Sequence, residues 1–243
     1  MPLLESPRAV QNSELKILAI DVGGSHIKAL VTGETQHRKF DSGPTLTAEE
    51  MAVGVRQMVE GWNYDVASIG YPGPVHGGKP ALEPQNLGNG WVDFDYAAAL
   101  GCPVRMINDA AMQALGSYEG GKMLFLGLGT GLGSTMIVAD QILPMELGDM
   151  PYRKRTFEEY VGRMGLKRLG RKRWRYCVFD VIERLTAALQ PEYIVLGGGN
   201  VELLKTLPPN CRPGDNANAF KGGFRLWQGE TLASIMPAKL ATS

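Results

Sequence analysis

Short apolar runs alternate with stretches of helical hydrophobic spacing along the chain. Lys16 to Asp21 is an apolar run that ends in a carboxylate and leads into the pair Gly23-Gly24, which predicts a buried strand followed by a tight turn. His26 to Val31 resumes the apolar character, so the two runs together predict a β-hairpin. From Ala48 to Trp62 the apolar residues recur at helical spacing, which predicts a helix.

The same signals continue through the rest of the chain. Further strands are expected at residues 66–70, 104–107, 123–128, 134–138 and 192–196. Further helices are expected at residues 94–100, 110–118 and 156–189. Strands that alternate with helices are typical of an α/β fold. The segment from Pro208 onward is rich in glycine, asparagine and proline, and we expect it to wrap over the surface.

Composition and charge are those of an ordinary globular protein. The chain has 243 residues, 44% of them hydrophobic and 21% charged, enough for one large domain or two lobes that share a cleft. Its 25 basic and 25 acidic residues create no net field that would attract nucleic acid or a membrane surface. Three scattered cysteines, no signal-peptide pattern in residues 1–14 and no apolar run of about 20 residues favour a cytoplasmic protein.

A strand followed by a glycine-rich turn occurs at residues 21–24 and again at residues 127–133. Because glycine has no Cβ, the backbone N–H groups of such a turn can approach an anion closely. In the second turn, the Thr130 hydroxyl between Gly129 and Gly131 can donate to a phosphate oxygen; a tight hairpin with glycines at positive φ is the alternative. In the first turn, Asp21 can hold a hydrated Mg²⁺ beside a phosphate.

Two further carboxylates are candidates for chemistry. Asn108-Asp109 closes an apolar strand, where side chains of an α/β sheet commonly project into a ligand cleft; an N-cap for the following helix is the alternative role of this aspartate. Glu146 lies between Met145 and Leu147, which suits a partly shielded carboxylate, and a solvated turn residue is its alternative.

Six short motifs occur in a fixed order. They are Asp21–Lys28, Gly70–Val75, Asn108–Ala110, Leu128–Gly133, Glu146–Gly148 and Leu196–Gly199. Each is weak alone, but together they closely resemble the ROK family of sugar kinases over roughly residues 16–227. Within that family, the chain is most similar to the polyphosphate/ATP glucokinase branch.

The resemblance implies an actin-like ATPase (ribonuclease H-like) fold, an α/β fold with two duplicated lobes and the active site between them. The expected lobes are residues 1–108 and residues 109–243, with the extreme C-terminus packing back on the first. The implied activity is that of a hexokinase or glucokinase, with Mg²⁺ as cofactor and ATP or polyphosphate as donor to the 6-hydroxyl of glucose or a related hexose. A catalytically weak sugar-binding sensor is the alternative, and a homodimer is expected because family members commonly form one.

Residue roles carry over from the family motifs by position. Asp109 is the implied catalytic base, and Asp21 is the implied metal-side residue. The implied sugar-binding residues are Asn108, Glu146, Gly70, Gly73, Asn86 and Asp149. The implied phosphate- and nucleotide-binding residues are Gly23, Gly24, Ser25, Lys28, Gly129, Thr130, Gly131, Gly197 and Gly198.

Asp149 departs from the family pattern. Many family members have a histidine here that contacts the sugar and contributes to a cysteine-rich zinc site, and the cysteine-rich stretch is also absent. We therefore expect no zinc. An ionised aspartate accepts hydrogen bonds from sugar hydroxyls but donates none, so weak activity, a different sugar and a sensor role stay open.

A second unusual feature is the basic stretch Arg153–Arg175, which holds ten of the 25 basic residues, opposed only by Glu158 and Glu159. The solvated face of a helix is one interpretation. The other is a track for polyphosphate, because arrays of lysine and arginine bind phosphate chains. No winged-helix segment accompanies the charges, so we expect no nucleic acid partner.

Overall fold

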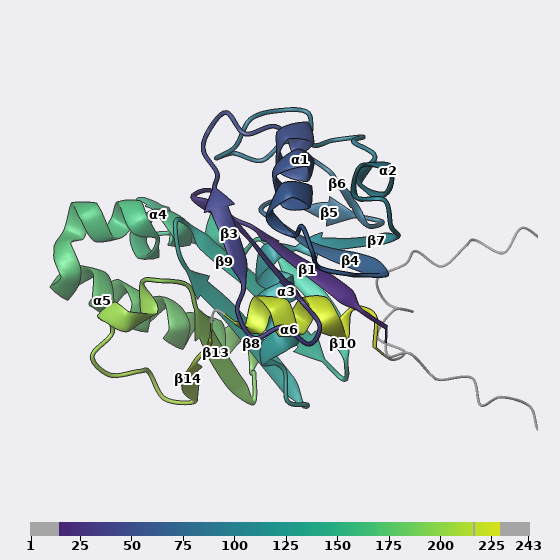
Figure 1. Ribbon diagram of the computed structural model, residues 1–243. Helices are drawn as coiled ribbons and strands as arrows, with labels where there is room; N and C mark the ends of the chain where they lie inside the picture. Colours follow the sequence, from purple (N-terminus) through teal and green to yellow (C-terminus); the bar gives the residue numbers. More distant parts are fainter. Residues whose placement is uncertain (1–14, 216, 229–243) are drawn as a thin grey trace, which may run out of the picture.

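The computed structural model describes residues 15–215 and 217–228, and its first half is built on a five-stranded sheet (Figure 1). The strand order is β3 (Arg38–Asp41), β2 (His26–Val31), β1 (Ile17–Val22), β4 (Val66–Tyr71) and β7 (Val104–Asn108). The first three strands are antiparallel, and β1, β4 and β7 are parallel. Helices α1 (Ala48–Met58) and α2 (Tyr96–Leu100) complete this half, the first lobe.

A second five-stranded sheet repeats this plan. Its order is β10 (Gln141–Met145), β9 (Leu132–Val138), β8 (Lys122–Leu128), β13 (Tyr193–Gly197) and β14 (Cys211–Pro213). As in the first sheet, β10, β9 and β8 are antiparallel, and β8, β13 and β14 are parallel. Helix α3 (Asp109–Ser117) packs on one face of this sheet, and α5 (Arg163–Leu189) packs on the other. We call this half the second lobe.

Short elements connect these parts. The strand pairs are β5 (Val75–His76) with β6 (Lys79–Pro80), and β11 (Pro151–Tyr152) with β12 (Arg155–Thr156). The remaining short helices are α4 (Phe157–Val161) and the 3₁₀ turns η1 (Leu147–Asp149) and η2 (Val201–Leu203). Within the described ranges, none of the helices combines the length and apolar character that crossing a bilayer requires.

The predicted elements recur with shifted boundaries. The helix predicted over residues 48–62 ends at Met58, and the one predicted over residues 156–189 is two helices, α4 and α5. A capping box between Thr156 and Glu159 begins α4. Gly170, at a φ of 71°, interrupts the helical backbone inside α5, because glycine adopts this conformation without a steric penalty.

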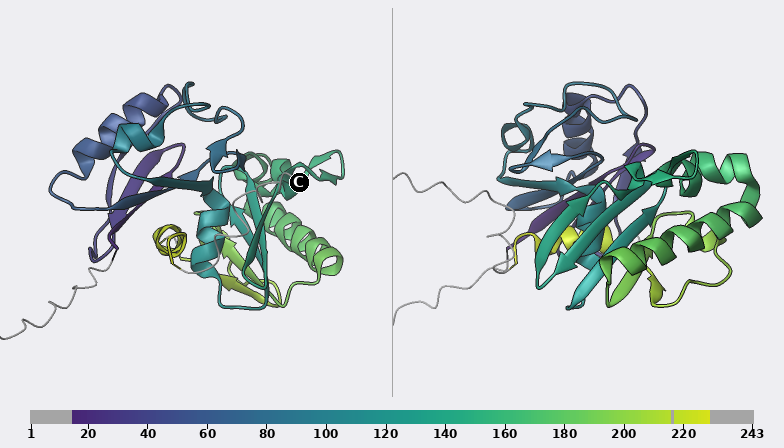
Figure 2. Two further views of the ribbon diagram at one scale, coloured as in Figure 1. Left: turned by 90° about the vertical axis from the view of Figure 1, so that its right-hand side faces the viewer. Right: turned by 180° about the vertical axis from the view of Figure 1, so that it is seen from behind.

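The end of the described chain corrects one prediction. Residues 218–225 do not wrap over the surface but form α6 (Asn218–Arg225), a helix that buries Ala219, Phe220, Gly222 and Gly223. It packs against α3, β1 and β4, and Figure 2 shows it end-on between the first sheet and α3. Glycine makes this possible: a Cβ on Gly222 would overlap the Met112 carbonyl oxygen. The extreme C-terminus, residues 229–243, lies outside the described residues.

Candidate active site

The junction between β7 and α3 places the two central polar residues. Asn108 is the N-cap of α3: its side chain accepts from the Ala111 N–H at 3.1 Å, and its Nδ2 donates to the Gly73 carbonyl at 3.1 Å. Asp109 is the first helical residue, and its Oδ1 accepts from the Ala110 N–H at 2.7 Å. The capping role considered for Asp109 thus belongs to Asn108.

Three acidic side chains converge on this junction from different elements. Burial, followed by the negative charges of Asp21 and Glu146, raises the pKa of Asp109 to about 7. Burial also raises the pKa of Asp21, although Lys28 Nζ lies 3.5 Å from its Oδ2 and acts in the opposite direction. A carboxyl group with a pKa near neutrality is suited to proton transfer at ordinary cellular pH.

The glycines of the first lobe allow close packing around this junction. A Cβ on Gly70 would collide with the Met112 side chain and would lie 3.4 Å from the Asp109 Cα. Gly73 contributes its carbonyl to Asn108. Farther along the chain, Asn86 lies beside the first glycine turn, since a Cβ on Gly24 would be 3.3 Å from the Asn86 Cβ. The structure thus places Asn86 next to the turn predicted to face phosphate.

The second glycine turn connects β8 to β9 and is braced by the loop after β13. Asn200 Nδ2 donates to the Gly129 carbonyl at 2.9 Å, and a Cβ on Gly198 would be 2.5 Å from the Leu128 carbonyl oxygen. The turn is the tight hairpin that the alternative predicted, but Gly129 and Gly131 are not at positive φ. Close contact explains why Gly131 is a glycine, because a Cβ there would overlap the Glu158 carboxylate.

Glu158 is a candidate site residue that sequence reasoning missed. Its place in the sequence indicates only a counter-charge to the basic stretch, yet its Oε2 accepts from the Leu132 N–H at 3.2 Å, directly beside the turn. A Cβ on Gly148 would lie 3.4 Å from the Glu158 Cβ, so the side chain also adjoins η1. The capping box of α4 was the available signal, because it places Glu158 in the first turn of a helix.

Asp149 lies close to the same group of side chains. Its N–H donates to the Glu146 carbonyl at 3.3 Å within η1. Burial raises the pKa of Glu146, and the charges of Asp149 and Glu158 raise it further. In the part of the chain that the structure describes, no three His, Cys, Asp or Glu side chains are grouped so as to hold a metal ion.

The basic stretch contacts the second glycine turn at Arg163, in its middle, and then leads away from the turn along α5. The Arg163 N–H donates to the Thr130 carbonyl at 3.0 Å, and α5 then runs over the face of the second sheet opposite α3. Several of its cations contact the protein itself. Arg155 pairs with Glu159, Arg153 stacks near three tyrosine rings, and Arg168 and Arg175 donate to backbone carbonyls.

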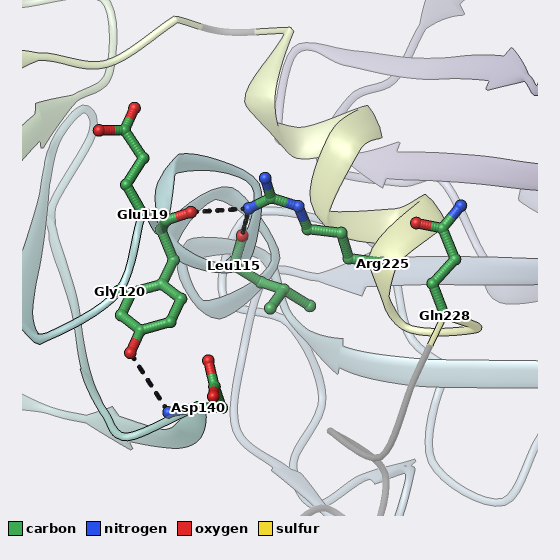
Figure 3. A pocket seen from close by; sticks show the side chains of 7 residues that line it. Leu115, Glu119, Gly120, Asp140, Arg225 and Gln228 are labelled. Carbon is green, nitrogen blue, oxygen red and sulfur yellow. Dashed lines mark hydrogen bonds between the residues drawn. The ribbon is translucent and has the colours of Figure 1, made fainter.

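A separate cavity of about 350 Å³ lies at the opposite end of α3 from Asp109 (Figure 3). Arg225 lines it and donates to the carbonyls of Leu115 and Tyr118 at 2.6 and 2.9 Å. The Tyr118 hydroxyl accepts from the Asp140 N–H at 3.3 Å. These polar groups serve the end of the helix, and none of the predicted site residues lines the cavity.

Known proteins share both sequence and fold with the chain. It is 31% identical over 144 residues to the bifunctional enzyme NanE/NanK of Brucella melitensis biotype 1, a match that covers 52% of the chain and 27% of that protein. The chain therefore spans only about a quarter of the length of the curated relatives it matches.

Solved structures match over most of the chain. The inorganic polyphosphate/ATP-glucomannokinase of an Arthrobacter species has a TM-score of 0.74 at 22% identity, covering 86% of the chain and 96% of that structure. A ROK family glucokinase of Streptomyces griseus, in complex with glucose and AMPPNP, has a TM-score of 0.67 at 16% identity, covering 88% and 100%. These similarities confirm the actin-like ATPase fold predicted from the motifs.

The family model for ROK proteins matches residues 17–144, more than half of the chain. This range includes both glycine turns and the Asn108-Asp109 junction. On this evidence, the chain belongs to the ROK family.

Proposed function

We propose that the chain is a hexokinase that transfers a phosphoryl group from ATP or polyphosphate to the 6-hydroxyl of glucose or a related hexose. One observation carries the proposal: Asp109, with a pKa of about 7, lies at the junction between β7 and α3, close to Asp21 on one lobe and Glu146 on the other. The names of the structural neighbours support a sugar acceptor and these two donors.

Asp109 is the base in this proposal. Its carboxylate takes the proton of the acceptor hydroxyl while the hydroxyl oxygen forms the new bond to phosphorus. The bond between that phosphorus and the leaving oxygen of the donor breaks in the same step, so the donor leaves one phosphate shorter. Positioning and charge neutralisation supply most of the catalysis in phosphoryl transfer, and the base contributes about 10²–10⁴-fold.

The acceptor sugar is proposed to lie between the two lobes. Asn108, fixed by its bond to Gly73, and Glu146 are the central ligands. Asp149 and Glu158 adjoin Glu146 and supply further acceptors for sugar hydroxyls. Gly70 serves by leaving space beside Asp109, and Asn86 lies toward the first glycine turn.

The donor phosphates are proposed to lie between the two glycine turns. Gly23, Gly24, Ser25 and Lys28 belong to the first, and Gly129, Thr130 and Gly131 to the second; Gly197 and Gly198 would flank the adenosine of ATP. Mg²⁺ fits beside Asp21, because the ion favours one or two carboxylates plus phosphate oxygens and would offset the charge that two nearby carboxylates concentrate there. When bound, it would neutralise charge on the phosphates.

The test is product formation with an inactive control. The protein, Mg²⁺ and glucose are incubated with ATP or with polyphosphate, and glucose 6-phosphate is measured for the wild type and Asp109→Asn. The variant should lose about 10²–10⁴-fold in kcat, because its amide cannot accept the proton. Equal turnover by the two proteins would refute the assignment of Asp109.

The sensor alternative has its own outcome in this experiment. A panel of hexoses is screened for binding by calorimetry in parallel with turnover. Binding of a hexose without product from either donor would favour a sensor, whereas product from another sugar would show that the acceptor is a different hexose.

A further inference from the structure

A row of charged side chains crosses the first sheet at the level of the predicted phosphate site. Asp21 on β1 is directly opposite Lys28 on β2, and Lys28 is directly opposite Lys39 on β3. Residues directly opposite in antiparallel strands project from the same face of the sheet. The row therefore runs from β1 to the edge strand β3, a distance of about 10 Å at the usual strand spacing.

This face of the sheet looks toward α6 and the second lobe. The alternate residues of β1 and β2, such as Ile20 and Ile27, lie in the core that packs against α1, so the row projects from the other side. On that side, His37 stacks on Phe220 of α6 with ring centroids 5.6 Å apart. Lys39 lies two residues farther along β3, toward the first glycine turn, where Ser42 Oγ donates to the Gly23 carbonyl at 2.6 Å.

The charges of this row are not balanced within the sheet. Like charges directly opposite on neighbouring strands destabilise a sheet, and Lys28 and Lys39 form such a pair. Asp21 lies 3.5 Å from Lys28, but Lys39 is exposed and forms no ion pair or side-chain hydrogen bond within the described residues. Asp41, the other carboxylate on this face, lies 3.3 Å from His26. The arrangement fits an anion that bridges the two lysines.

We propose that Lys28 and Lys39 bind successive phosphates of a long inorganic polyphosphate donor. Lys39 is thereby a residue that determines donor specificity. This inference rests on the proposed function, which places the transferred phosphoryl group near Asp109 and Asp21. The chain of phosphates leaves that point over Lys28 and reaches solvent at Lys39 on the sheet edge. A nucleoside triphosphate has too few phosphates to span the whole row while its base is bound at another position.

The row competes with the basic stretch Arg153–Arg175 as a path for polyphosphate. The row lies on the face that carries Asp21, whereas most of α5 covers the far face of the second sheet. A donor that follows α5 would lead away from the first lobe. Lys172, an exposed residue of α5, therefore serves as a matched control for Lys39, because both are solvent-exposed lysines.

The experiment measures binding and turnover separately. The Kd for long-chain polyphosphate is measured by calorimetry for the wild type, Lys39→Gln and Lys172→Gln, and KM is measured for polyphosphate, tripolyphosphate and ATP. We expect Lys39→Gln to raise the Kd and KM for long-chain polyphosphate about five- to tenfold, as loss of one charge-assisted contact would. Its KM for ATP and for the sugar should stay within about twofold of the wild type, as should all constants of Lys172→Gln.

Several outcomes would overturn the proposal. An unchanged Kd for Lys39→Gln, or no binding of polyphosphate by the wild type, would exclude the row as its site. An equal loss in Lys172→Gln would assign the binding to general electrostatics or to α5. Because calorimetry needs no turnover, polyphosphate binding that weakens in Lys39→Gln without any sugar phosphate being formed would refute the proposed function while leaving the phosphate site in place.

Discussion

At the scale of single residues, the protonation of Asp109 makes two properties depend on pH. The base accepts a proton only when it is ionised, and its pKa is about 7. We expect kcat/KM to rise with pH through about 7 and to level off above it. A pH–rate profile in buffers of constant ionic strength tests this. A profile that is flat between about pH 5.5 and 8.5 would contradict the role of Asp109 as base.

The same shift in pKa affects stability. The pKa of Asp109 is raised from an ordinary value of 3.8, so the folded state binds the proton more tightly than the unfolded state does. This contribution to the free energy of unfolding is fully present below about pH 4 and is lost as the pH rises through about 7. Asp109→Asn removes the dependence.

We therefore expect the inactive Asp109→Asn variant to be more stable than the wild type at about pH 8, and the difference to disappear near pH 4. In a protein of this size, each 1 kcal/mol of added stability raises the Tm by about 2–4 °C. Thermal melts at both pH values measure the difference. A variant that melts lower than the wild type at the higher pH would show that the carboxylate stabilises the site.

At the scale of elements, the contact between α3 and α6 depends on glycine. A Cβ on Gly222 would overlap the Met112 carbonyl, and one on Gly116 would overlap the Asn218 carbonyl. Backbone atoms cannot move aside as the end of a flexible side chain can. We expect Gly222→Ala to lower the free energy of unfolding by about 1–3 kcal/mol or more, the usual cost of overpacking, and denaturant melts measure the change.

Gly43→Ala is the control for that substitution. A Cβ on Gly43 has no atom within 4 Å, and its φ is not positive, so the free energy of unfolding should change by less than about 0.5–1 kcal/mol. Similar effects of the two substitutions would mean that the loss of glycine itself, rather than the contact of α6 with α3, governs stability.

At the scale of the whole molecule, the end of the described chain joins the two lobes. Ser68 on β4 is buried, and its Oγ donates to the Gly223 carbonyl at 2.6 Å and accepts from Trp227 Nε1 at 3.0 Å. Arg105 on β7 stacks on the Trp227 ring and donates to the Leu226 carbonyl. Strands β4 and β7 of the first lobe therefore contact residues that follow the second lobe in the sequence.

We expect the two lobes to unfold together in a single calorimetric transition. Ser68→Ala should lower its Tm, because the buried Gly223 carbonyl and the half-buried indole N–H of Trp227 lose their partner at a cost of about 1–3 kcal/mol. The transition should remain single. Separate transitions in the wild type would contradict the coupling, and an unchanged Tm in the variant would show that these two hydrogen bonds contribute little to it.

Much of the fold and of the candidate site could be predicted from the sequence. The hairpin of β1 and β2 follows from two apolar runs around a glycine pair, and both runs are local signals. The order of six motifs led to the ROK family and to its fold, and both are confirmed. The roles of the site residues stay predictions. Glu158 was not predicted as a site residue, because it contacts the Leu132 N–H and Gly148, which are distant from it in sequence, and no local pattern reports such contacts.

The sequence by itself predicted the seven strands β1, β2, β4, β7, β8, β9 and β13, the carboxylates and glycine turns that follow several of them, and the family to which the chain belongs; the edge strands β3, β10 and β14 were not predicted. These features can be recognised from residues close together in the sequence, or from the order of short motifs, without knowledge of tertiary contacts. The tertiary structure alone decided that Asp21, Asp109 and Glu146 lie close together, that the pKa of Asp109 is about 7, and that α6 packs between the lobes. These properties arise from burial and from charges brought together across long stretches of chain, and no local pattern encodes them.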